Sequence, residues 1–382
     1  MVRSFQYRIY PTSKQTKQME SVLDVCCRLW NYFLQQRIET YKATKESVSC
    51  FAQIGEIPQI AVDDDRMKMV YSQVLRDAPC RLDKAFQAFF RRVKQGCTPG
   101  FPRFKSRDRY NSFTYPQNNG SFKLDVDGKI YLSKIGHVKI AYHRRVMGNW
   151  KTCVVKKTST DKWYVVITAE SEMVKRVNTN PAVGIDLGLK EFAVLSDGTT
   201  IKRARFFKAE EDALAKSQRK LENQSKGTIE RRRDKRVVAR IYERITNKRN
   251  DFTHQASRKI ANAYGTICVE DLNIRGMLRE PTIVINGKTI SATPTHRSIQ
   301  DVAWNQFVNQ LKYKAEEAGA LVVMVNPKNT TKACSVCGKM TNKDLSQREH
   351  VCSCGHKEDR DLNASKNILS VGLHTLANRK AA

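Results

Sequence analysis

Four cysteines near the end of the chain have the spacing of a zinc site. Cys334 and Cys337 form a Cys-x-x-Cys pair, and Cys352 and Cys354 follow as a Cys-x-Cys pair. Tetrahedral zinc takes four soft ligands from two short turns, and such closed sites are structural rather than catalytic. The spacing therefore predicts one structural zinc ion held by these four thiolates.

The second cysteine pair is one residue shorter than the commoner spacing. His350 and His356 lie on either side of it, and an imidazole is also a zinc ligand. The sequence leaves open whether four thiolates hold the ion or a histidine replaces one of them. The competing interpretation is four unrelated thiols.

Three acids outside the cysteine pairs form a second candidate metal site. Asp186 lies in an apolar strand-like run, Glu270 ends another, and Asp361 stands at the start of the last helix. Singly, such an acid is often only a cap. As a set, two adjacent strands and a helix can bring three carboxylates together, and carboxylates that close are stable around cations. Two Mg²⁺ (or Mn²⁺) ions held there can activate water for phosphodiester hydrolysis.

Two glycines flank Asp186, at positions 184 and 188. Alternation along the strand directs the Asp186 side chain to the face opposite Val183, Ile185 and Leu187. Because glycine has no side chain, the pattern predicts room for a bulky ligand beside Asp186.

The charge of the chain points to a polyanionic partner. Lys and Arg total 68 against 38 acids, which gives a net charge of +30. An excess of this size is typical of nucleic-acid-binding proteins. The densest basic run lies in a predicted helix, where such runs are usually solvated faces, but the total excess favours phosphate contact. Its members are Arg231, Arg232, Arg233, Lys235 and Arg236.

The remaining composition indicates an intracellular protein. No apolar run is long enough to span a membrane, and the N-terminus lacks the apolar core of a signal peptide,. We therefore expect a cytoplasmic protein with no membrane partner. The seven cysteines outside the two pairs are expected to be reduced core or incidental thiols.

The first half of the sequence predicts a small β-barrel that carries a helical insertion. A strand is expected over 5–10, with helices over 13–42 and 61–96,. Further short strands are expected over 112–115, 129–132, 138–140 and 163–167,. The first strand is expected to complete the sheet formed by the later ones.

The second half predicts an α/β domain. The expected strands cover 182–188, 192–195, 200–201, 266–270 and 321–325,. A basic helical region is expected over 205–263, and a capping box of Ser298 and Asp301 predicts the start of a helix that Gly319 ends. A final helix is expected from Asp361 onward.

Several motifs together resemble TnpB, the RNA-guided endonucleases of insertion sequences, which are similar to type V CRISPR effectors. They are the GIDLG strand, the VEDLN strand, the CSVCG and CSCGH knuckles and DRDLNASKNIL. The YRIYPT start, the PRFKSRDRYNSFTYPQ segment and the basic helix ending in RNDFTH also match, so the resemblance covers nearly the whole chain.

The resemblance implies a RuvC-like RNase H fold with a zinc-ribbon insertion, behind a wedge-type β-barrel with a helical recognition lobe. The barrel would comprise 1–12 and 112–178, and the recognition lobe 13–111. The nuclease domain would comprise 179–382, with the ribbon at 331–356. On the family's motifs Asp186, Glu270 and Asp361 match the three catalytic acids, whereas Asp359 does not.

The resemblance also implies the partners, a guide RNA from the transposon end and a double-stranded target DNA. Base pairing would read the sequence, and the protein would read backbone shape and a short flanking motif. Two rival functions are a transposase that cuts and joins DNA itself and a cleavage-deficient RNA-guided repressor. The intact acid set disfavours the repressor. The ribbon between the second and third acids disfavours the transposase, as does the guide-binding N-terminal half.

Overall fold

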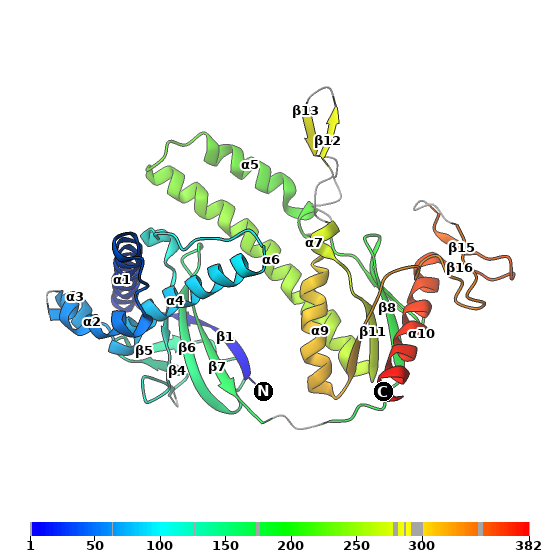
Figure 1. Cartoon of the computed structure of the whole chain (residues 1–382), viewed down its shortest axis with the longest axis horizontal. Helices are drawn as coiled ribbons and strands as arrows, with labels where there is room; N and C mark the ends of the chain where they lie inside the picture. The colour runs from blue at the N-terminus through cyan, green and yellow to red at the C-terminus, as the bar shows by residue number, and fades with distance from the viewer. Residues whose placement is uncertain are drawn as a thin grey trace. The chain divides into compact units, whose positions relative to one another are not determined.

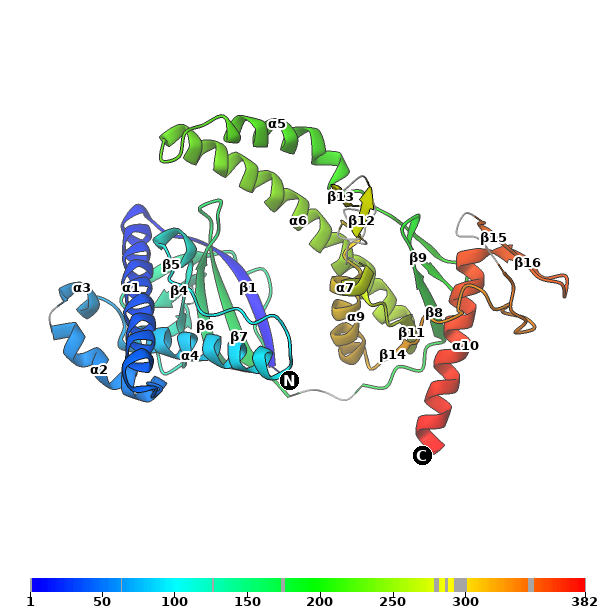
Figure 2. The same cartoon turned by 45° about the horizontal axis from the view of Figure 1, so that its top comes forward.

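The computed structural model describes residues 2–62, 64–125, 127–172, 176–277, 282–285, 288–291, 301–342 and 347–381. The chain divides into two compact units, Met1–Met173 and Val174–Ala382, and each is described by itself (Figures 1 and 2). No helix among the described residues is long and apolar enough to cross a membrane. The predicted capping residue Ser298 lies outside the described residues.

The first unit is built on a seven-stranded antiparallel sheet with the order β2-β6-β7-β1-β5-β4-β3. Its strands are β1 (Val2–Tyr10), β2 (Ser112–Tyr115), β3 (Phe122–Leu124), β4 (Lys129–Leu132), β5 (Gly136–Ile140), β6 (Asn149–Lys157) and β7 (Trp163–Glu170). The prediction that the first strand completes this sheet is confirmed, because β1 pairs with β7 on one side and β5 on the other.

The predicted barrel is a curled sheet in the structure. Strands β2 and β3 end the strand order, and no backbone pairing joins them within the described residues. The rings of Tyr115 in β2 and Phe122 in β3 nevertheless lie 6.2 Å apart, so the ends of the sheet approach through side chains. The sequence pattern indicated strands and turns but could not show whether the last ladder closes.

Four α-helices and one short 3-10 helix (Arg107–Arg109) lie between β1 and β2 among the described residues. The α-helices are α1 (Ser13–Thr44), α2 (Cys50–Val62), α3 (Asp65–Lys68) and α4 (Ser72–Lys94). Helix α1, which was predicted over 13–42, buries an apolar stripe that runs from Met19 through Trp30 to Phe33. The prediction of one helix over 61–96 is wrong in its extent, because the helical backbone is interrupted between α3 and α4. Helix α2 was not predicted.

The second unit holds a five-stranded sheet with the order β10-β9-β8-β11-β14. Its strands are β8 (Ala182–Leu187), β9 (Glu191–Leu195), β10 (Thr200–Lys202), β11 (Thr266–Glu270) and β14 (Leu321–Val325). The three strands β8, β11 and β14 run parallel, and β9 and β10 extend the sheet as an antiparallel hairpin. Two short strands, β12 (Thr282–Ile285) and β13 (Lys288–Ser291), form a separate hairpin that follows α7 (Ile274–Met277).

Helices cover both faces of this sheet, as Figure 1 shows. On one face, α6 (Ile229–Ala263) and α9 (Trp304–Ala318) pack against the apolar side chains of β8, including Val183 and Ile185. On the other face, α10 (Arg360–Ala381) packs through Ile368 against Cys268 of β11. The expected α/β arrangement is therefore present.

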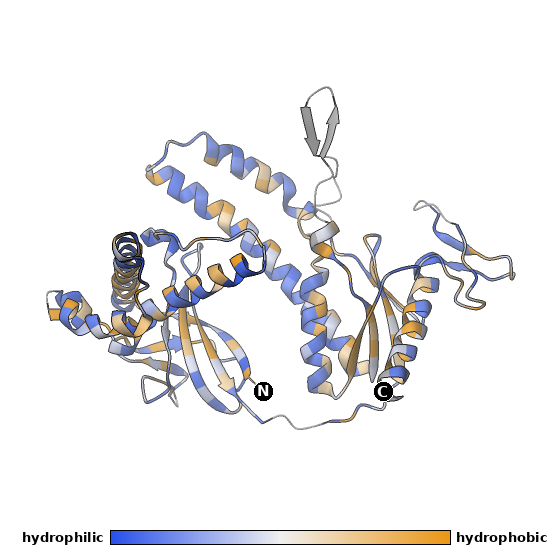
Figure 3. Cartoon of the chain, viewed as in Figure 1, coloured by the Kyte–Doolittle hydropathy of each residue, from blue (hydrophilic) through white to orange (hydrophobic). Residues whose placement is uncertain are grey.

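The predicted basic helical region is a helical hairpin. Helix α5 (Glu211–Glu222) packs against α6 through Leu214, Ile241 and Ile245. A short turn joins the two helices, and Thr228 caps the start of α6. Figure 3 shows that hydrophilic residues dominate both helices in their paired part. A narrow apolar seam and a few polar contacts join the two helices, and most of this hairpin is solvent-facing and basic.

Candidate active site

Asp186 and Glu270 lie on the same face of the sheet, the face that α10 covers. The parallel register pairs Val269 with Ile185, which puts Glu270 of β11 level with Asp186 of β8. Val183, Ile185 and Leu187 face the opposite core, as the alternation of the strand predicted. The side chains of Asp186 and Glu270 therefore meet the start of α10, where Asp361 lies.

The pKa of Asp186 depends on the charges of the other acids near it. Burial, together with the negative charges of Glu270 and Asp361, raises the pKa of Asp186 to about 8. Asp359 adds to this effect, whereas the guanidinium of Arg360 opposes it. Carboxylates so arranged resist ionisation together unless positive charge is supplied among them.

Glu270 is nearly buried and has one identified hydrogen-bond donor. Its side chain is 8% exposed, and burial raises its pKa. The hydroxyl of Thr330 donates to Glu270 Oε1 at 2.6 Å, which partly offsets that rise. Thr330 was not found by sequence reasoning, because a threonine between a strand and a cysteine knuckle carries no signal of its own.

Asp361 and Asp359 differ in the use of their carboxylates. Asp359 Oδ1 accepts from the backbone N–H groups of Asp361 and Leu362 at 2.9 and 3.2 Å, so it caps the N-terminus of α10,. Asp361 Oδ1 instead accepts from Arg360 Nε at 3.1 Å. Asp359 therefore caps α10, and Asp361 remains the candidate third acid beside Asp186 and Glu270.

The space at Gly184 is filled by helix α10, which corrects the expectation about the first glycine that flanks Asp186. A Cβ atom at Gly184 would lie 2.0 Å from the carbonyl oxygen of Ser365 and 2.6 Å from the nitrogen of Leu369, both in α10. Gly184 therefore allows the helix backbone to approach the sheet closely and leaves no room for a bulky ligand. This contact keeps the start of α10 near Asp186.

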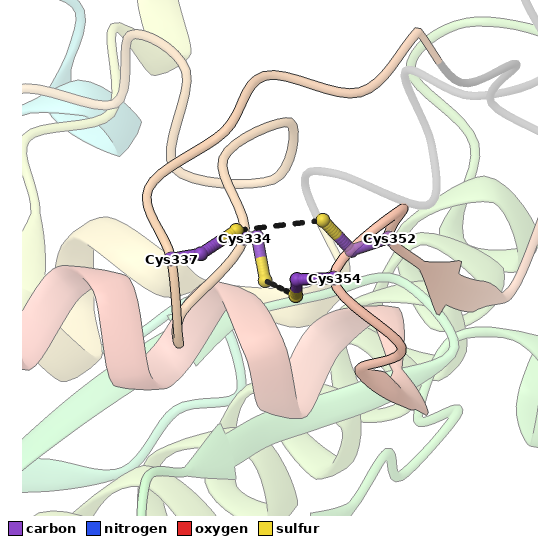
Figure 4. A group of neighbouring side chains, drawn as sticks. All are labelled: Cys334, Cys337, Cys352 and Cys354. Carbon is purple, nitrogen blue, oxygen red and sulfur yellow. Dashed lines mark hydrogen bonds between the residues drawn. The ribbon is translucent and has the colours of Figure 1, made fainter.

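The four predicted cysteine ligands come together in the segment between β14 and α10 (Figure 4). Their sulfur atoms all lie within 4.8 Å of one another. The Sγ atoms of Cys334 and Cys354 are 3.8 Å apart, and those of Cys337 and Cys352 are 3.5 Å apart. Sulfurs at the corners of a tetrahedron around zinc are about 3.8 Å apart, so the cluster can hold that ion.

The backbone of the knuckles favours the thiolate form of two of these cysteines. The N–H of Cys354, together with hydrogen bonds from the other three cysteine side chains, lowers the pKa of Cys352 to about 6. Burial works against the thiolate of Cys334, but N–H groups of Cys337 and Val336 and a hydrogen bond from His350 lower its pKa to about 7. His350 thus supports a ligand, and neither it nor His356 belongs to the ligand cluster of the described residues.

In the described part of the chain the acids form a wider group than the thiols. Only the four cysteines have ligand atoms that all lie within 4.8 Å of one another. The oxygens of Asp186, Glu270 and Asp361 therefore do not all lie within that distance of one another in the described, metal-free structure.

The basic run on α6 divides into two kinds of side chain. Arg231 Nη1 donates to the backbone carbonyls of Leu221 and Gln224 at 2.7 and 2.6 Å, so its guanidinium fastens the end of α5. Arg232, Arg233, Lys235 and Arg236 are exposed, and Arg232 Nη2 makes one longer hydrogen bond, to the carbonyl oxygen of Gly227 at 3.4 Å. Phosphate contact stays a prediction for these four, whereas the sequence did not indicate the structural use of Arg231.

Three family models match parts of the chain. The model described as “Probable transposase” matches residues 159–280, and the model described as “Cas12f1-like, TNB domain” matches residues 304–368. A model described as “Helix-turn-helix domain” matches residues 1–46. In this structure that last stretch is strand β1 followed by the single helix α1.

Two curated relatives match over nearly the full length. “Putative RNA-guided DNA endonuclease” of Streptomyces pristinaespiralis is 30% identical over 379 residues, which cover 97% of this chain and 89% of the relative. “Putative RNA-guided DNA endonuclease InsQ” of Escherichia coli is 30% identical over 385 residues, which cover 98% of this chain and 94% of the relative.

A solved structure has a similar fold. The match is to a chain of the “Cryo-EM structure of the Cas12f1-sgRNA-target DNA complex”, with a TM-score of 0.59. It covers 96% of this chain and 98% of the other, at 12% sequence identity. At that identity the likeness concerns the fold alone.

Proposed function

The chain belongs to the TnpB family of RNA-guided DNA endonucleases, and from that premise we propose that it cuts target DNA by metal-dependent phosphodiester hydrolysis. Asp186, Glu270 and Asp361 would be the catalytic acids of a RuvC-like site. The observation that carries this proposal is the parallel register that sets Glu270 level with Asp186 on the face that α10 covers. Burial and the charges of the two other acids raise the pKa of Asp186 to about 8. Such a group gains most from bound cations.

The donor sets of the two sites fit different metals. Carboxylate oxygens suit hard cations such as Mg²⁺ or Mn²⁺, whereas four thiolates suit zinc. Bound at the acids, two divalent cations would supply an activated water and charge neutralisation at the leaving oxygen. The chain's own part is to hold Asp186 and Glu270 on two strands and Asp361 on α10, with α10 fixed against β8 at Gly184.

The ribbon zinc would be structural. Four protein ligands complete its coordination, so no position remains for water or substrate. One zinc ion would tie together two knuckles that lie directly before the helix carrying Asp361. The cysteine cluster therefore supports the folding of the segment between the second and third acids.

A reprogramming experiment tests the proposed function. RNA that copurifies with the protein is sequenced, and its guide segment is replaced with one complementary to a new plasmid site. Because base pairing would select the target, we expect cleavage to move to the new site and to require Mg²⁺ or Mn²⁺. Cleavage that ignores the new guide would contradict the proposal.

The rival function of a transposase makes a different product. An enzyme that joins DNA as well as cutting it would transfer one DNA end into a target molecule. The same reaction mixtures are therefore analysed for joined products on a gel. We expect cut DNA without joined products, whereas strand transfer would favour the transposase.

The exposed part of the α6 basic run is proposed to contact the guide RNA or the RNA–DNA duplex. Changing Arg232 and Arg233 to Gln should weaken RNA binding, because a phosphate that the protein no longer neutralises keeps its counterions. The slope of log K against log salt should flatten by ~0.7 to 0.9 for each such phosphate. Binding measured across a salt series for variant and parent checks this.

A single change at Arg231 provides the contrast for that measurement. Arg231→Gln removes two hydrogen bonds to the end of α5. We expect a lower melting temperature with an unchanged salt slope. If the lines of the Arg232 and Arg233 variant and the parent coincide instead, this face lies outside the nucleic-acid interface.

A further inference from the structure

Thr330 lies at the base of the cysteine ribbon, beside the acid site. It is 4% exposed and follows β14 by five residues. Its hydroxyl lies 2.6 Å from Glu270 Oε1 and 3.1 Å from the carbonyl oxygen of Pro327. The shorter contact joins a hydroxyl to a carboxylate, and a charge-assisted hydrogen bond of this kind is the stronger of the two.

Two asparagines of α10 hold the segment that contains Thr330. Asn367 Nδ2 donates to the carbonyl oxygens of Thr330 and Ala333, both at 2.8 Å. Asn363, which is fully buried, donates to Ala333 at 2.8 Å and accepts from the N–H of Ser335 at 2.9 Å. Ser335 follows the predicted zinc ligand Cys334, so a hydrogen-bonded path runs from the knuckle to Glu270.

Resting on the proposed function, we propose that Thr330 is a positioning residue through which the base of the ribbon orients the Glu270 carboxylate for divalent-cation binding. The hydroxyl of Thr330 is the donor that the described residues supply to Glu270. Without this hydrogen bond, the orientation of the nearly buried Glu270 carboxylate would no longer be fixed. The asparagines keep Thr330 at a fixed distance from α10, which also carries Asp361.

Metal binding to the full-length, zinc-loaded chain tests this proposal in the absence of nucleic acid. Mn²⁺ binding is followed by electron paramagnetic resonance for the parent, Thr330→Val and Thr330→Ser. Valine keeps the shape but loses the hydroxyl, so we expect Mn²⁺ affinity to fall by roughly 10-fold or more, the usual effect of losing a supporting hydrogen bond behind a metal ligand. Serine keeps the hydroxyl and should restore affinity close to that of the parent.

A second variant keeps the test valid if Thr330→Val does not fold. Asn367→Ala keeps the Thr330 hydroxyl but removes two hydrogen bonds that hold the Thr330 segment in position. We expect it to weaken Mn²⁺ binding in the same direction, with zinc content unchanged. Parent-like Mn²⁺ affinity in Thr330→Val, or in Asn367→Ala if the first variant does not fold, would overturn the role of Thr330.

Mn²⁺ binding by an Asp186→Ala variant shows whether a failure lies in the role of Thr330 or in the proposed acid site. If Asp186→Ala loses Mn²⁺ binding while Thr330→Val keeps it, the acid site stands and Thr330 is only a packing residue. If Asp186→Ala binds Mn²⁺ as the parent does, the acid site itself is wrong. The Mn²⁺ concentration for half-maximal cleavage, measured on the same proteins, should follow the binding data.

Discussion

Asp186→Ala is expected to abolish DNA cleavage while leaving guide and target binding nearly intact. The substitution removes one carboxylate of the proposed two-cation site, and the basic surfaces of the chain do not change. Cleavage of a guide-matched plasmid and binding of the same target are measured side by side. Glu270→Ala and Asp361→Ala should behave in the same way.

Asp359→Ala is the matched control for this prediction. Asp359 lies two residues from Asp361 and contributes to the charge around Asp186, but its carboxylate caps α10. Losing the cap should cost about 1 kcal/mol of stability, typical for such residues. Cleavage should persist under stable conditions. Undiminished cutting by Asp186→Ala would remove the acids from the mechanism.

The raised pKa of Asp186 adds a stability signature to the same site. In the folded metal-free chain the pKa is about 8, against an ordinary value of 3.8. Between these values the folded state holds a proton that the unfolded state has released, so this group's contribution to stability falls as the pH rises through that window. Asp186→Asn should therefore melt at a higher temperature than the metal-free parent near the upper value, with the difference shrinking toward the lower one.

Replacing Cys334 and Cys337 with Ser is expected to unfold the ribbon and to reduce cleavage strongly. Two of four thiolates are lost, and metal binding supplies much of the folding energy of such small units. Elemental analysis should fall from about one zinc per chain, the content of a single four-ligand site, to near zero. Protease cleavage within 331–342 and 347–359 should become faster.

Cys97→Ser provides the control for the zinc prediction. Cys97 is an exposed free cysteine far along the chain from the ribbon. Its replacement should leave zinc content, protease resistance and cleavage unchanged. A parent chain that contains no metal at the cysteines yet cuts DNA at full rate would refute the structural role of zinc.

Much of the second unit was predictable because local patterns there agree with tertiary packing. The side chains of the strand around Asp186 alternate between the two faces of the sheet. Gly319 ends α9 in the left-handed conformation, with φ of 75°. The two cysteine pairs indicated their cluster through spacing alone. The parallel strands β8 and β11 also place Asp186 and Glu270 at the same end of the sheet. The apolar runs of the sequence suggested this arrangement but could not prove it.

Other features depend on long-range contacts that sequence patterns do not encode. The two partners of Arg231 lie 10 and 7 residues earlier, so its structural use was invisible in a run of like charges. Thr330 acts 60 residues from Glu270. Gly184 suggested open space, because the sequence could not show that a helix from the far end of the chain fills it.

The uneven exposure of the cysteine cluster has a consequence for handling the protein. Cys337 and Cys354 are exposed, whereas their neighbours Cys352 and Cys334 are buried. Each exposed sulfur lies within 3.8 Å of a buried one. In metal-free protein we therefore expect air oxidation to form two disulfides, Cys334–Cys354 and Cys337–Cys352. Oxidised in this way, the ribbon could no longer take up zinc. Preparations made without zinc and reductant should therefore trap the chain in a covalently closed, inactive form that a thiol reductant followed by zinc restores.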